Sequence, residues 1–109
     1  GGVIGSITQN GVSQVLFNTS SDYRLKEDLK DFNGIDIIKV IKTYDFKWKA
    51  EDRRSYGVIA HELQETLPDL VVGEKDGENT QGVDYSKLTP ILVKAIQELE
   101  ARVKELENK

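Results

Sequence analysis

The chain has 109 residues, a net charge of −4 at pH 7, 38% hydrophobic residues and 31% charged residues, which is typical of one globular domain with a modest core. The negative charge, with no basic stripe to offset it, argues against nucleic acid as a partner. No apolar run approaches the length of a membrane span. With no cysteine and one histidine, neither a disulfide nor a zinc site is expected, and nothing implies a cofactor.

Residues 3–17 alternate apolar and polar side chains around Asn10-Gly11. An Asn-Gly pair between two alternating runs is the strongest short signal for a β-hairpin. The segment has little apolar surface to bury by itself. We therefore expect a β-stub that continues a structure lying upstream.

The compact body is expected within residues 32–72. Asn33 is a plausible N-cap, and Ile35, Ile38 and Ile41 follow it at helical spacing, which predicts a short helix.

Tyr44, Phe46 and Trp48 then alternate along a predicted strand and share one face of it. They either pack in the core, which is the interpretation we favour, or form an aromatic platform for carbohydrate. A charged turn at residues 51–55 follows.

The segment from Tyr56 onward predicts a short strand that leads into a helix ending before Pro68. The polar loop after it contains Asp76-Gly77, a typical hairpin tip. Residues 86–107 predict a long helix with Pro90 in its opening turns.

That long helix carries an apolar seam, defined as Leu92, Ile96, Leu99, Val103 and Leu106. The spacing of four, three, four and three is that of a coiled coil. Isoleucine and valine then occupy a positions and leucine d positions, so that Arg102 falls at g and Glu107 at the next e, where they attract across parallel chains. Such a seam formally favours dimers without fixing the number of chains. The alternative is an amphipathic helix packed on its own domain.

The stretch "NTSSDYRLKEDL" at residues 18–29 has two interpretations. Ser21 or Asp22 can cap a helix whose first turns contain Glu27 and Asp28. Alternatively, Ser21 is a nucleophile and Lys26 its base, five residues further on. A lysine acts as a base only when neutral, and its reference pKa of about 10.4 must then be lowered by burial or a nearby positive charge such as Arg24. Spacing alone favours the cap.

Four blocks of sequence, in order, resemble a known family: "FNTSSDYRLKEDL", "YDFKW", "YGVIAHELQETLPDLV" and "VDYSKLTPILVKAIQELEARVKELE". The family is the C-terminal intramolecular chaperone domain of bacteriophage tailspikes and tail fibres, the S74 peptidases of self-cleaving endosialidase tails. The resemblance implies an α+β fold made of a β-stub, a small mixed body and a C-terminal helix in a trimeric coiled coil. It therefore favours three chains over the two that the seam residues suggest.

The resemblance also implies a function. Residues 1–21 would end a fibre shaft, and residues 22–109 would register three chains of the same polypeptide in a phage tail. The domain would then release itself as a serine endopeptidase, with Ser21 as nucleophile and Lys26 as base. The family is described as cut between Ser21 and Asp22. A serine does not easily attack its own carbonyl, so attack from a neighbouring chain would be needed, whereas an N-to-O shift at Ser20 would cut before Ser21.

The family's Gly-x-Ile-Ala-x-Glu motif falls on Gly57, Ile59, Ala60 and Glu62, with His61 in the variable slot. His61 either orients Lys26 or donates to an oxyanion, or is a surface or capping residue. Glu62 either holds Arg24 or Lys26 or is a solvated helix charge. Two rival functions remain: a structural trimerisation module that never cuts, and a receptor-binding fibre tip.

Overall fold

The computed structural model describes residues 20–109, so the hairpin expected at residues 3–17 lies outside the described residues. The chain divides into a first unit that ends at Asp31 and a second unit, Phe32–Lys109. The described part of the first unit contains one short 3₁₀ helix, η1 (Tyr23–Leu25).

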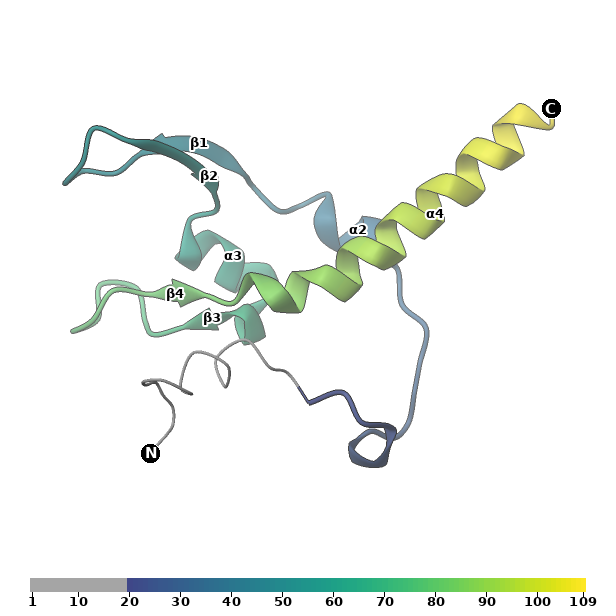
Figure 1. The fold of residues 1–109 in the computed structure, drawn as a ribbon, viewed down its shortest axis with the longest axis horizontal. Coiled ribbons are helices and arrows are strands. Elements are labelled where there is room, and N and C mark those ends of the chain that lie inside the picture. Colours follow the sequence, from purple (N-terminus) through teal and green to yellow (C-terminus); the bar gives the residue numbers. More distant parts are fainter. Residues whose placement is uncertain (1–19) are drawn as a thin grey trace. The chain divides into compact units, whose positions relative to one another are not determined.

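The second unit is mixed α/β and consists of two small hairpins, short helices and one long C-terminal helix, as Figure 1 shows. In chain order its elements are α2 (Gly34–Ile38), β1 (Tyr44–Lys47), β2 (Arg54–Gly57), α3 (Ala60–Thr66), η2 (Pro68–Leu70), β3 (Val71–Val72), β4 (Gly82–Val83), η3 (Tyr85–Leu88) and α4 (Thr89–Glu107). Both sheets are antiparallel pairs, β1 with β2 and β3 with β4. The predicted order of elements is confirmed for this unit.

The aromatic strand does not face the core as we expected. β1 pairs with β2 so that Phe46 lies opposite Ser55. Trp48 follows the end of β1, is 43% exposed, and packs edge-on against Phe46, with ring centroids 4.8 Å apart. Tyr44 is also exposed. The core-packing prediction was wrong for these two residues, because the core forms elsewhere in the unit.

The core is small and lies where α3, η2 and η3 meet. Leu63, Leu70 and Leu88 form its buried cluster, and Val58 and Ile91 are among the partly buried side chains packed against it. Many other large apolar side chains of residues 20–109 remain exposed, so this core buries only a small part of the apolar side chains in this range. Within the same residues, no helix combines the length and the apolar character that crossing a membrane requires.

The second hairpin tip has the predicted chemistry. The Gly77 N–H donates to the Glu74 carbonyl at 3.0 Å, and Asp76 adopts a left-handed backbone with φ of 59°. Aspartate tolerates this conformation better than most residues. The loop therefore closes as the Asp76-Gly77 pair predicted.

The C-terminal helix begins three residues later than we expected. Residues Tyr85–Leu88 form η3, which Asp84 caps by accepting the Ser86 N–H at 3.1 Å. Pro90 explains the change, because its ring in an α-helix clashes with the carbonyl four residues earlier and its nitrogen donates no hydrogen bond. The α-helix proper runs from Thr89 to Glu107.

The short helix α2 is held against α4 at very close range. The Glu98 carboxylate on α4 accepts the Ile35 N–H at 2.8 Å, a role that the Asn33 side chain does not fill. A Cβ at Gly34 would lie 2.6 Å from the Ala95 nitrogen and 2.7 Å from the Ile91 carbonyl oxygen. Both atoms are backbone, so only glycine fits at this helix crossing.

We expect Gly34→Ala to lower the free energy of unfolding by about 1–3 kcal/mol, the usual range for overpacking a tight contact. Gly82→Ala is the matched control, because a Cβ there meets nothing within 4 Å, and it should change stability by less than about 0.5 kcal/mol. Urea unfolding followed by circular dichroism measures both values. Equal stabilities for the two variants would refute the close α2–α4 contact.

Candidate functional site

The segment around Ser21 forms a single capped turn. Asp22 precedes η1 as its N-cap, and its carboxylate accepts the Arg24 backbone N–H at 2.9 Å. The same carboxylate accepts two hydrogen bonds from the Arg24 side chain, one from Nε to Oδ1 at 3.0 Å and one from Nη2 to Oδ2 at 2.8 Å. The predicted capping role is confirmed for Asp22.

This ion pair shifts the pKa values of both partners. The pKa of Asp22 lies below its ordinary value, first because of the side-chain hydrogen bond from Arg24 and then because of the Arg24 backbone N–H. The hydrogen bond to Asp22 in turn raises the pKa of Arg24. Both side chains are exposed, so solvent screens the pair and its contribution to stability is small. Its geometric effect is to hold the turn that follows Ser21.

Lys26 follows the turn in extended conformation, with φ of −124° and ψ of 141°, and its N–H donates to the Tyr23 carbonyl at 3.2 Å. The longer helix that we expected through Glu27 and Asp28 was wrong: η1 ends at Leu25, and Asp28 has φ of 55°.

Ser21 and Lys26 are both exposed, and within residues 20–31 no hydrogen bond joins their side chains. The Ser-Lys dyad therefore stays a prediction.

Glu62 connects α3 to the first hairpin. Its carboxylate accepts the Tyr44 hydroxyl at 2.9 Å. That hydrogen bond is the main cause of a raised Tyr44 pKa, because ionising the phenol would remove the donated proton. Residues 20–31 belong to the other unit, so a role for Glu62 in holding Arg24 or Lys26 stays a prediction.

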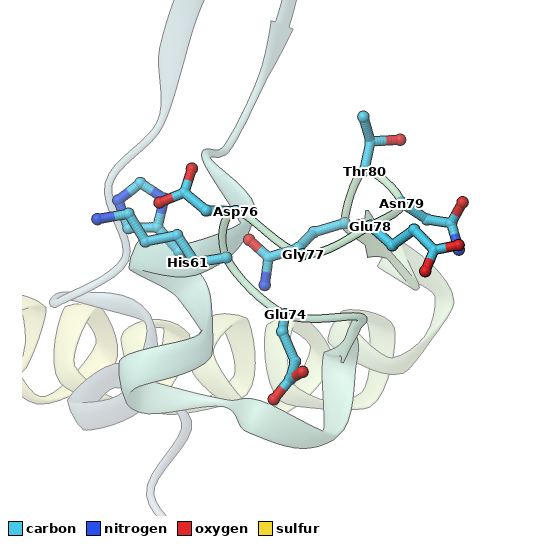
Figure 2. Close-up of a pocket in the computed structure, with 9 residues that line it drawn as sticks. His61, Glu74, Asp76, Gly77, Glu78, Asn79 and Thr80 are labelled. Atoms are coloured by element: carbon cyan, nitrogen blue, oxygen red, sulfur yellow. The ribbon is translucent and has the colours of Figure 1, made fainter.

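His61 lies beside the second hairpin loop, as Figure 2 shows. It is half-buried and lines a shallow pocket of about 350 Å³ together with loop residues 74–81. Three acidic residues, Glu74, Asp76 and Glu78, lie on this loop. Residues 20–109 nevertheless contain no group of three or more His, Cys, Asp or Glu side chains placed to hold a metal ion. A catalytic role for His61 stays a prediction.

The need for glycine at position 57 comes from Tyr85, a residue that we did not predict to be near it. A Cβ on Gly57 would lie 2.9 Å from the Tyr85 hydroxyl and 3.2 Å from the Phe46 ring. The same hydroxyl accepts the Val58 N–H at 3.2 Å. Glycine therefore lets Tyr85 anchor the end of β2. No local signal reveals this contact, because Tyr85 lies 27 residues beyond Val58.

Comparison with known proteins finds one matching family and several similar phage tail fibre proteins. The family described as chaperone of endosialidase, peptidase S74, matches residues 21–72. The long tail fiber protein Gp37 of Enterobacteria phage M1 and that of Enterobacteria phage Ox2 are each 35% identical over 97 residues, covering 81% of this chain and 39% of the relative. The Gp37 of Salmonella phage S16 is 34% identical over 108 residues, covering 84% of this chain and 14% of the relative.

The chain thus spans about two fifths of the length of the first two relatives and a smaller share of the third. The family match begins at Ser21, the residue singled out as nucleophile, and ends at Val72 in β3. It includes the capped turn at Asp22 and the motif that begins at Gly57. Residues 21–72 of this chain thus match the chaperone-of-endosialidase family, peptidase S74.

Proposed function

We propose that this chain is an assembly chaperone of a phage tail fibre. In this proposal residues 22–109 bring three copies into register through α4, and residues 1–21 end the shaft that is being assembled. The description of the family and the long tail fibre names of the relatives support this function. The assembled fibre would belong to the virion tail.

The observation that carries the proposal is the exposure of the α4 seam. Leu92, Ile96, Leu99, Val103 and Leu106 are between 44% and 66% exposed. Apolar surface left in water costs about 25 cal/mol per Å² relative to burial. Five such side chains in one line at heptad spacing favour packing of this face of α4 against other chains, since α2 packs on other residues of the helix, Ile91, Ala95 and Glu98. The choice of three chains follows the family resemblance.

The second part of the proposal is self-release at Ser21. Lys26 as a neutral amine takes the Oγ proton of Ser21, and Oγ attacks a backbone carbonyl. An ester forms as the peptide C–N bond breaks, and the leaving amine takes the proton from Lys26. Water then hydrolyses the ester. Cutting the Ser21–Asp22 bond requires attack by Ser21 of a neighbouring chain. A shift onto the carbonyl of Ser20 would instead cut before Ser21. The peptidase name of the family supports the release step.

A non-cleaving trimerisation module is the second candidate. The observation that favours it is the capped turn itself, in which Asp22 already has a structural role and the exposed Ser21 and Lys26 side chains are not joined by a hydrogen bond. The two functions share the assembly step. They differ only in whether the chain is cut.

We expect the native shaft fused to this domain to form soluble, detergent-resistant trimers, and the shaft without residues 22–109 to aggregate. Intertwined β-chains depend on long-range pairings that form slowly. Until these pairings form, unpaired strand edges are exposed and prone to aggregation. Adding the domain as a separate chain should rescue little, because registration depends on the local concentration that a covalent link provides. Gel filtration of the soluble fraction measures the yield. Equal yields with and without the domain would refute the chaperone function.

A further inference from the structure

An apolar groove of about 440 Å³ lies beside the start of α4. Its lining includes Tyr56, Val58, Tyr85, Leu88 and Leu92. Tyr56 is 88% exposed, and Tyr85 is also exposed. Leu92 is at the same time the first residue of the α4 seam, so the groove continues the apolar surface of the seam onto the body.

The seam by itself is short for a stable assembly. From Leu92 to Leu106 it contains two heptads, whereas coiled coils are recognised from about three or four heptads. Isolated helices of this length are also marginal in water. An assembly built on α4 therefore needs apolar contacts beyond the seam, and the groove is continuous with it.

The heptad phase identifies what would reach the groove. With Ile96 at a, Leu88 occupies a g position and Val93 an e position. Leu88 is the last residue of η3 and directly precedes α4; because its backbone angles are helical, φ of −76° and ψ of −22°, we extend the phase back by this one residue. In parallel coiled coils a g residue faces the e residue that lies five positions further along the neighbouring helix, the same relation as Arg102 and Glu107. In the proposed parallel assembly Leu88, which is 9% exposed and lines the groove, would therefore lie beside Val93 of the next copy.

Val93 is unusual for its position. Positions e and g commonly carry glutamate or lysine, but here e is a β-branched apolar residue that is 48% exposed in the single chain. Burial of such a side chain in an apolar groove lowers the free energy of the assembly, whereas a position at the solvated rim buries little of its apolar surface.

We propose that Val93 of a second copy of this chain occupies the groove beside Leu88, so that the interface extends from the α4 seam onto the Tyr56–Tyr85 wall of the neighbouring body. This inference rests on the proposed parallel assembly and adds a contact between Val93 of one copy and the groove of the next. Each copy offers both a groove and a Val93, so the contacts close into a ring.

Val93→Glu tests the proposal against an ordinary coiled coil, in which a glutamate at e is well tolerated. We expect Val93→Glu to raise the concentration at which the trimer dissociates by at least about tenfold, because it places a charge in an apolar groove. Gln97→Glu, which adds the same charge at an exposed b position of the same helix, should change it by less than about twofold. Sedimentation of a dilution series measures both. If the wild-type protein is a trimer and both variants dissociate at the same concentration, the groove contact is overturned. The chaperone proposal is then unaffected.

Cross-linking then identifies the occupant, because the chain has no cysteine of its own. Tyr56→Cys combined with Val93→Cys should form chain-to-chain links with a short bis-maleimide, and Tyr56→Cys with Gln97→Cys should not. A link only within one chain, or no link in a protein that is still a trimer, would overturn the inference. A wild-type monomer in the same sedimentation series would overturn the trimer proposal and the inference together.

Discussion

Replacing Lys26 by arginine, in the domain attached to its shaft, is expected to abolish the cut at Ser21 and leave the trimer intact. Arginine keeps the positive charge but does not become a neutral base in a protein. If Lys26 were only an exposed surface charge beside a capped turn, arginine would serve equally well. Lys30→Arg is the matched control, since Lys30 is an exposed lysine of the same unit that pairs with Asp28, and this variant should be cut normally.

Ser21→Ala and Lys26→Ala should likewise remain uncut, with a loss of rate of at least about 1,000-fold, as expected when a nucleophile or its base is removed. Mass spectrometry of purified protein reports the fragments. A fragment that begins at Asp22 identifies the Ser21–Asp22 bond, and one that begins at Ser21 identifies the bond before it. Normal fragments from Lys26→Arg would show that the Ser21 segment is only a capped turn.

The second large effect is expected for Leu99→Asp in the α4 seam. In a parallel trimer this change places three carboxylates in one layer of the coiled coil, where unpaired charge is costly to bury. We expect the dissociation concentration of the trimer to rise at least 100-fold, which corresponds to about 2.8 kcal/mol. Leu99 is 47% exposed in the single chain, so the domain itself should keep its fold.

Ala101→Asp is the control for Leu99→Asp, because it adds the same residue to an exposed position outside the seam of the same helix. Sedimentation measures the assembly, and far-ultraviolet circular dichroism measures the helix content of both variants. A trimer that tolerates Leu99→Asp as well as Ala101→Asp would exclude the seam from the interface.

Features set by neighbouring residues could be predicted from the sequence. The hairpin tip at Asp76-Gly77 and the end of α3 before Pro68 depend on local backbone preferences, and both are confirmed. The start of α4 was misplaced because the effect of Pro90 extends to the preceding turn. The aromatic residues of β1 were misplaced because alternation gives a strand its two faces but does not say which of them the core covers.

Features that join distant residues could not be predicted. The tight fit of Gly34 on α4 and the cap that Glu98 gives to α2 depend on contacts about 60 residues apart in the chain. At the candidate site, the Asp22 cap is local and was predicted. The Tyr85 contact that requires Gly57 is not local and was missed.

We expect release only after assembly, because the base is expected to become neutral only where the trimer buries it. The most direct measurement is to refold the shaft–domain protein, separate monomer from trimer by size at early times, and determine the fragment masses in each fraction under denaturing conditions. We expect cut chains in the trimer fraction and intact chains in the monomer fraction. Cut chains in the monomer fraction, appearing before any trimer, would show that release does not depend on assembly.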